Sequence, residues 1–224
     1  MTYYIVVSDN KPGIRKRITS GVMMSEAKTP LVSAILLAAG KSERMGLNKL
    51  LLPFGGRTVI QRTLDSLLAS RAGEVIVVLG SKSQEINASI GSRRARSVLN
   101  PNFAKGMSTS LITGLGVMSS RAKFVIVALG DQPLITPRVY NQLIEAAQNS
   151  EKGIIVPTCK GERGNPIVIS TRYRAELLKQ KGDIGGRELL KAYPDEVLEV
   201  PVDCEGVVVN INTREEYEKR LKGL

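Results

Sequence analysis

Histidine and tryptophan are missing from this chain, and only two of its 224 residues are cysteines. The lack of histidine excludes imidazole general bases, imidazole metal ligands and Ser–His triads. A metal ion would therefore have to bind to carboxylates, amides or the two cysteines. Cys159 and Cys204 form no C-x-x-C pair, so neither a zinc site nor a disulfide framework is expected. We expect buried, inert thiols in a reducing compartment, which favours a cytoplasmic protein.

Long apolar runs and aromatic residues are also scarce. No run approaches the ~18 apolar residues of a membrane span, and the first residues lack the order of a signal peptide. The net charge of +11 calls for an anionic partner, but aromatic residues make up only 4% of the chain and accompany no basic helix. We therefore expect polyphosphate ligands, and neither nucleic acid nor a membrane, as partners.

The length suits one domain with a real core, because 42% of the residues are hydrophobic. Residues 1–30 fit this domain poorly: a possible short strand, Tyr3–Val7, is followed by a break and by a cationic cluster at residues 15–17. We expect residues 1–30 to be a dispensable N-terminal extension and residues 31–224 to form the domain. An added edge strand is the alternative for the extension.

Strand-like and helix-like segments alternate from Val32 onward. The strand-like segments are rich in valine and lack polar alternation, which is typical of a mostly parallel sheet covered by helices on both faces. We therefore predict an α/β fold. The predicted strands are Val32–Leu37, Val75–Leu79, Ser97–Leu99, Phe124–Leu129, Gly153–Pro157, Pro166–Ile169, Val197–Val202 and Val207–Asn210. The predicted helices, from the 3.6-residue period and start signals such as Thr136-Pro137 and the Thr213–Glu216 capping box, are Thr58–Ala69, Met107–Met118, Pro137–Ala147, Asp183–Leu190 and Thr213–Leu221.

The first of these strands leads into a turn of small residues and spaced cations. Ala38-Ala39-Gly40 is followed by Lys41, Arg44 and Lys49. Small residues let backbone N–H groups approach phosphate oxygens, and the cations neutralise the charge that remains. An ordinary strand-to-helix turn with a solvated basic loop is the alternative. The spacing matches neither the Walker A loop nor G-x-G-x-x-G, which disfavours a dinucleotide-binding oxidoreductase.

A second motif, Gly130-Asp131-Gln132-Pro133, follows the buried segment Phe124–Leu129. A carboxylate directly after a buried strand lies at the carboxyl edge of the sheet, where α/β proteins bind ligands. Asp131 can hold Mg²⁺ against a triphosphate, because Mg²⁺ binds few protein oxygens and keeps phosphates and water. An Asp in a type I turn is the alternative.

The string Leu37–Leu51 resembles the signature of nucleotidyltransferases with a GT-A-like fold. The pattern L-A-A-G-x-S-x-R-M-G-x-x-K-L-L is most similar to the molybdenum cofactor cytidylyltransferases, and next to the guanylyltransferases of the same cofactor. The resemblance implies a three-layer Rossmann-like, GT-A-type fold. It also implies transfer of CMP from CTP (or GMP from GTP) to the terminal phosphate of a phosphorylated pterin-type acceptor, molybdopterin, with release of pyrophosphate. Mg²⁺ is the implied cofactor, and a client molybdoenzyme is an implied further partner.

The resemblance also implies residue roles. Lys49, Arg44 and Asp131 are the implied catalytic residues: Lys41 and Arg44 hold the β- and γ-phosphates, Lys49 lies near the α-phosphate, and Asp131 binds the metal. A segment resembling N-P-x-[WF]-x-x-G-M-x-S-S-L begins at Asn100 and implies contact with the base and ribose. A helix N-cap is the alternative for Ser108. The implied nucleotide-binding residues are Leu37, Ala38, Ala39, Gly40, Lys41, Arg44, Lys49, Gly106, Ser108 and Ser110.

The second metal ligand is expected on the final predicted strand. The family usually reads D-I-D-T-P-E-D-Y there, whereas this chain has Asn210 and Asn212 in place of both acids. Asn210 is the expected ligand, and capping of the next helix is the alternative. Two loops resembling R-G-x-P and G-D-x-G-A-R imply acceptor-binding residues, although plain turns and an Asp183 N-cap are the alternatives. These residues are Arg163, Asn165, which replaces the usual His, Asp183 and Arg187.

Three readings compete at this point. The first is the cytidylyltransferase, favoured by Ala39, where the guanylyltransferases typically carry Gly. The second is an enzyme of the same fold with GTP or another phosphorylated acceptor. The third, suggested by the two Asp-to-Asn departures, is a non-catalytic cofactor-binding partner of a molybdoenzyme.

We expect a chain that starts at Met24 to fold and function like the full chain, because the domain pattern begins only at Val32. Circular dichroism melting and turnover of the two chains would check this. Loss of folding or of activity on truncation would show that the extension belongs to the domain.

Overall fold

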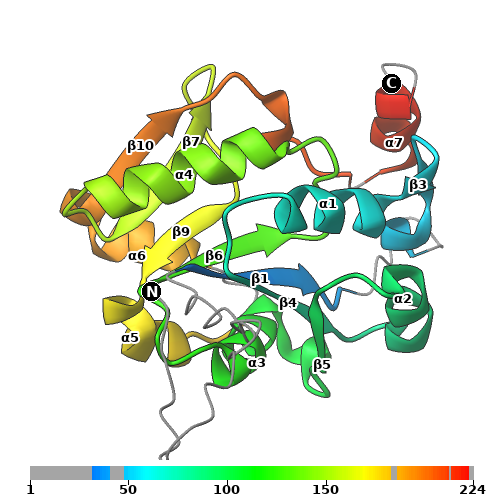
Figure 1. Ribbon diagram of the computed structural model, residues 1–224, viewed down its shortest axis with the longest axis horizontal. Coiled ribbons are helices and arrows are strands. Elements are labelled where there is room, and N and C mark those ends of the chain that lie inside the picture. The colour runs from blue at the N-terminus through cyan, green and yellow to red at the C-terminus, as the bar shows by residue number, and fades with distance from the viewer. Residues whose placement is uncertain (1–31, 41–47, 183–185, 212, 222–224) are drawn as a thin grey trace, which may run out of the picture.

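A mostly parallel β-sheet forms the centre of the protein in this computed structural model (Figure 1). The structure describes residues 32–40, 48–182, 186–211 and 213–221. The strand order is β10-β7-β9-β6-β1-β4-β5, and within this path β9 alone runs antiparallel to its neighbours. These strands are β1 (Val32–Ala38), β4 (Glu74–Leu79), β5 (Arg96–Leu99), β6 (Phe124–Leu129), β7 (Ile154–Cys159), β9 (Ile167–Ser170) and β10 (Val197–Pro201).

Helices cover both faces of this sheet (Figure 1). The first face packs against α1, α2 and α4, and the second against α3, α5 and α6. Alternate residues of β1 serve the two cores: Leu36 belongs to the first and Ile35 to the second, and both are fully buried. The helices are α1 (Val59–Leu68), α2 (Ser83–Ile90), α3 (Met107–Val117), α4 (Pro137–Asn149), α5 (Arg174–Leu178), α6 (Arg187–Ala192) and α7 (Arg214–Leu221).

The predicted fold class, a three-layer α/β arrangement with a mostly parallel sheet, is confirmed. The segment Phe124–Leu129 is a strand with the predicted bounds. Helix α4 begins at Pro137, although the hydroxyl of its N-cap residue Thr136 makes no capping bond. The predicted capping box of α7 forms, because Thr213 N donates to Glu216 Oε2 and Glu216 N donates to Thr213 Oγ1.

The predicted strand Val207–Asn210 is wrong. This segment begins as a short 3-10 helix, η6 (Glu205–Val207), and continues as irregular chain. Its carbonyls accept from the side chain of Gln132 and from Asn165 N, and the next residue, Ile211, donates its N–H to Asp131 O, so the segment does not join the sheet. Apolar β-branched residues predicted a strand, but tertiary hydrogen bonds determine the conformation here.

Several shorter elements are not visible in the sequence pattern. They include α2, α5, the two-residue strand β8 (Glu162–Arg163) and a small hairpin of β2 (Pro53–Phe54) and β3 (Arg57–Thr58). The hairpin supports α7, since the Tyr217 hydroxyl donates to Pro53 O, and Figure 1 shows α7 beside β3. The predicted helix Asp183–Leu190 is observed from Arg187, and residues 183–185, like the extension 1–30, lie outside the described residues.

The close packing of α3 on β1 can be tested with a pair of glycines. A Cβ on Gly114 would lie 2.6 Å from Ile35 Cγ2, whereas a Cβ on Gly116 would meet no atom within 4 Å. Gly114→Ala should therefore destabilise the protein by ~1–3 kcal/mol through overpacking. Gly116→Ala should stabilise it by up to ~1 kcal/mol through helix propensity. Urea unfolding of both variants provides the measurement, and equal stabilities would contradict this packing.

Candidate active site

Two charged residues from distant parts of the chain meet at the carboxyl edge of the sheet. Lys49 Nζ lies 2.5 Å from Asp131 Oδ2, and the two residues are separated by 82 positions in sequence. Their side chains are 18% and 14% exposed, so the pair is largely shielded from solvent yet open on one side. Lys49 follows β1, and Asp131 follows β6, the strand paired with β1 in parallel. A cation and a carboxylate therefore lie together where parallel strands end.

The Asp131 turn is fixed against the end of β1. Gly130 N donates to Leu37 O at 2.9 Å, and the Thr63 hydroxyl of α1 donates to Gly130 O at 3.1 Å. A Cβ on Gly130 would lie 3.0 Å from Leu37 O, so a larger residue would push the turn away from β1. The carboxylate is thus held by a rigid strand, which is the kind of support that a preorganised site needs.

Lys49 is positioned by a short 3-10 helix, η2 (Lys49–Leu51), with Leu50 buried beneath it. The Asn48 side chain caps this helix, because its Oδ1 accepts a hydrogen bond from Leu50 N at 3.1 Å. Asn48 Nδ2 is buried and makes no hydrogen bond to any described residue. Asn48 is not among the site residues predicted from the sequence. Its position directly before Lys49 is the signal that could have identified it as part of the site.

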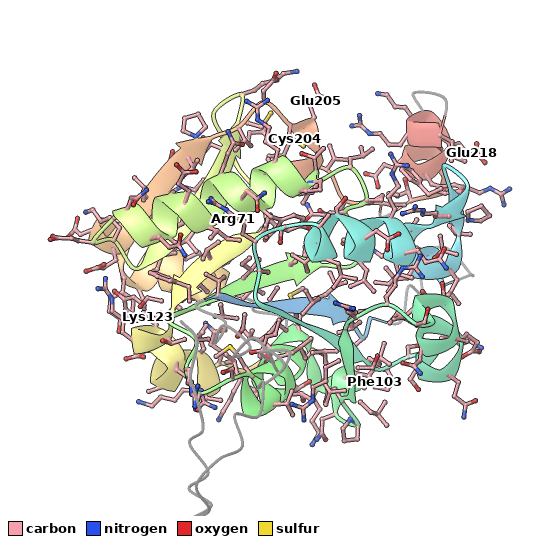
Figure 2. The ribbon with its side chains drawn as sticks, viewed as in Figure 1. Arg71, Phe103, Lys123, Cys204, Glu205 and Glu218 are labelled. Carbon is pink, nitrogen blue, oxygen red and sulfur yellow. The ribbon has the colours of Figure 1, made fainter. Side chains whose placement is uncertain are left out.

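The residues at the end of β1 and directly after it differ in their exposure to solvent. Leu37, Ala38 and Ala39 are buried, whereas Gly40 is exposed and a Cβ there would meet nothing within 4 Å. A Cβ on Gly80, just past β4, would lie 2.7 Å from both Ala39 Cβ and Phe103 Cβ. Gly80 therefore allows the turn to pack against the 3-10 helix η3 (Phe103–Lys105), where Figure 2 labels Phe103. Lys41 and Arg44 lie outside the described residues.

Asn210 comes from the irregular segment after η6 and reaches the same edge. The next residue, Ile211, donates its N–H to Asp131 O at 3.1 Å, so Asn210 lies close to the Asp131 turn. A carboxylate and an amide are hard oxygen ligands, which suits Mg²⁺ or Mn²⁺. The described residues contain no group of three or more acidic, Cys or His side chains that could cage a metal. This donor set fits an ion that shares its coordination with phosphates and water.

The start of α3 meets the glycine-rich loop that precedes α6. Ser108 N donates to Gly182 O at 3.0 Å. The helix N-cap is Gly106, so the alternative assignment of Ser108 as N-cap is wrong. Ser108 is 1% exposed, and its Oγ has no hydrogen-bond partner among the described residues. Ser110 Oγ accepts from Asn100 Nδ2 at 3.0 Å, so this hydroxyl supports the loop after β5.

Those predicted acceptor residues that the structure describes lie on separate elements. Arg163 lies on β8, and its Nε donates to Glu199 Oε1 of β10 at 2.6 Å. Asn165 is buried and donates its N–H to Val207 O at 2.8 Å, which anchors the segment that carries Asn210. Arg187 is exposed at the start of α6, and Asp183 lies outside the described residues. The contacts of the described residues do not join Arg163 to the Lys49–Asp131 pair.

The helices show no transmembrane character within the described ranges: none is both long enough and apolar enough to cross a bilayer.

Curated relatives match nearly the whole chain. Nicotine blue oxidoreductase of Paenarthrobacter nicotinovorans is 27% identical over 88% of this chain and 100% of that protein. The purine catabolism protein PucB of Bacillus subtilis is 30% identical over 85% and 96%. The molybdenum cofactor cytidylyltransferase of Escherichia coli is 22% identical over 83% and 93%.

Solved structures agree with this fold. The crystal structure of Rv0371c from Mycobacterium tuberculosis superposes with a TM-score of 0.77 at 27% identity, covering 87% of this chain and 99% of the other. Rv0371c has also been crystallised with manganese, and that structure matches with a TM-score of 0.75 at 25% identity over 87% and 100%. The model of the MobA-like NTP transferase domain matches residues 34–197, which contain most of β1 together with Lys49 and Asp131. The chain therefore belongs to the MobA-like NTP transferase family.

Proposed function

We propose that this protein transfers CMP from CTP to the terminal phosphate of a molybdopterin-type cofactor and releases pyrophosphate. The observation that carries the proposal is the Lys49–Asp131 pair at the carboxyl edge of the sheet. The similarity to a molybdenum cofactor cytidylyltransferase over 93% of that protein's length supports it. A nucleotidyltransferase needs a cation for the triphosphate and a metal-binding acid in one place, and this edge provides both.

The reaction asks for little covalent chemistry from the protein. An oxygen of the acceptor phosphate attacks the α-phosphorus of CTP, and the bond from that phosphorus to the oxygen bridging to the β-phosphate breaks. That electron pair leaves with pyrophosphate. The attacking phosphate is already anionic near neutral pH, so no side-chain base is needed and the lack of histidine is no obstacle. Catalysis then consists of positioning and of neutralising charge.

Each residue has a proposed part in this scheme. Lys49 lies against the α-phosphate and stabilises the charge that shifts there. Lys41 and Arg44 hold the β- and γ-phosphates, and Gly40 leaves room for the backbone to approach them. Asp131 and Asn210 would hold Mg²⁺, which supplies further neutralisation of the triphosphate oxygens when bound. The residues proposed to contact the base and ribose of the nucleotide are Gly106, Ser108 and Ser110.

The acceptor would bind beside the start of α3. The Ser108–Gly182 contact holds Gly182 beside the start of α3, and Arg187 begins α6 five residues later. We propose Arg187 and Asp183 as ligands of the acceptor. We propose that Asn165, whose N–H donates to Val207 O of the irregular segment, also binds the acceptor. Arg163 would have to leave Glu199 in order to reach the acceptor.

The competing readings predict different products. Two relatives, PucB and nicotine blue oxidoreductase, are not named as molybdenum cofactor transferases. This chain has no G-x-G-x-x-G motif, which disfavours a dinucleotide-binding oxidoreductase. Pyrophosphate release from CTP and molybdopterin supports the transferase. Nucleotide binding without turnover would support a non-catalytic cofactor-binding partner.

Removing either member of the charged pair should abolish most turnover. We expect Lys49→Ala and Asp131→Ala each to lower kcat by at least ~100-fold, in line with loss of one preorganised charge-stabilising group. Arg71→Ala is the control, because Arg71 forms an exposed ion pair with Glu145 before β4, at the opposite edge of the sheet. Wild-type turnover in either pair variant, measured as pyrophosphate release, would refute these roles.

Base choice should depend on Ala39. Its methyl group is buried against Gly80, and we propose that it fixes the turn in a position that suits a pyrimidine better than a purine. We expect kcat/KM to be higher for CTP than for GTP. Ala39→Gly should narrow that ratio by ~10-fold or more, since one methyl group discriminates by ~1–3 kcal/mol. Preference of the wild-type protein for GTP would overturn the assignment to CTP.

A further inference from the structure

Gln132 joins the Asp131 turn to the segment that carries Asn210. Its side chain is fully buried. Its amide nitrogen Nε2 lies 3.3 Å from Gly206 O, 3.2 Å from Val207 O and 3.5 Å from Val209 O. A primary amide has two N–H groups, so both of its donors are directed at the backbone of this one segment.

The segment depends on these bonds because the sheet does not hold it. Residues 208–211 have no strand or helix partner. Asn165 N donates to Val207 O at 2.8 Å, and the Gln132 amide donates to the carbonyls of residues 206, 207 and 209. Ile211 N in turn donates to Asp131 O at 3.1 Å. Removing the amide would leave the buried carbonyls of Gly206 and Val207, and the partly buried carbonyl of Val209, without their side-chain donor.

Close packing makes the link stiff as well as bonded. A Cβ on Gly206 would lie 2.8 Å from the Leu134 carbonyl carbon, and a Cβ on Gly164 would lie 2.3 Å from Val207 O. The segment is thus pressed against the chain just after Gln132 on one side and against Gly164 on the other. Both contacts restrict movement of the segment relative to the Asp131 turn.

The amide oxygen of Gln132 gains nothing from this arrangement. Gln132 Oε1 is buried and has no hydrogen-bond partner among the residues described, which is costly for a buried polar atom. A hydrophobic residue would avoid that cost, so the benefit of glutamine here lies in its two N–H donors.

We propose that Gln132 is a positioning residue that holds Asn210 beside Asp131, so that the two ligands can share one divalent ion. This inference rests on the proposed function for the identity of the site. Gln132 touches neither substrate nor metal in this role and acts only through the backbone of residues 206–209.

The test measures Mn²⁺ affinity of the full chain with a non-hydrolysable CTP analogue, from the EPR signal of free Mn²⁺. Gln132→Met keeps the side-chain length and removes both donors; we expect it to raise the Kd for Mn²⁺ ~10-fold, as loss of an outer partner of a metal ligand typically does. Asn210→Ala should also raise the Kd. In the Asn210→Ala background, Gln132→Met should add no further increase. Additive effects, or an unchanged Kd in either single variant, would overturn the proposal.

Glu205→Gln is the matched control on the same segment. Glu205 lies at the outer surface (Figure 2). It pairs with Lys160 at 2.6 Å and with Arg220 at 3.6 Å. Its replacement should leave the Kd for Mn²⁺ unchanged. A rise equal to that of Gln132→Met would show that any loosening of the segment suffices and would overturn the specific role of the amide.

If Gln132→Met does not fold by circular dichroism, Gln132→Asn, which withdraws the amide by one methylene group, is measured with the same expectations. CMP transfer by the wild-type protein reports the proposed function separately, so failure of one is not mistaken for failure of the other.

Discussion

The structure around the candidate site depends on one ion pair, Lys49 with Asp131. Opposite charges at 2.5 Å with side chains less than one fifth exposed attract each other more strongly than they would in water. The pair joins the chain after β1 to the chain after β6, and it orients both groups before any ligand arrives. Other contacts support it: Gly130 on Leu37 O, the Asn48 cap of η2, and Ile211 on Asp131 O.

This arrangement explains how a chain without histidine can position a phosphate group and neutralise its charge. Charge neutralisation and placement need cations, carboxylates and backbone N–H groups, all of which are present at the carboxyl edge of the sheet. The two asparagines in place of the usual acids reduce the negative charge offered to a metal. We infer that the buried hydrogen bonds from Gln132 matter more for this reason. A neutral amide such as that of Asn210 binds a metal ion more weakly than a carboxylate, so its affinity depends more on correct placement.

Much of the fold could be predicted from sequence because its signals are local. Uninterrupted apolar runs such as Phe124–Leu129 and the Thr213–Glu216 capping box carry their own conformational preference. The conformation of residues 206–209 could not be predicted, since the carbonyl groups of Gly206, Val207 and Val209 bond to a side chain 70 or more positions away. The meeting of Lys49 and Asp131 could be expected because each motif follows a buried strand, and the family resemblance implies the same. The Arg163–Glu199 pair depends on the edge position of β10, which no local pattern reveals.

The most direct test of the account is a crystal structure of the protein with a non-hydrolysable CTP analogue and Mn²⁺, with the metal located by its anomalous signal. The account predicts one manganese peak bound to Asp131 and to triphosphate oxygens, with Lys49 Nζ in contact with the α-phosphate. Nucleotide bound away from the ends of β1 and β6, or manganese that does not contact Asp131, would contradict it.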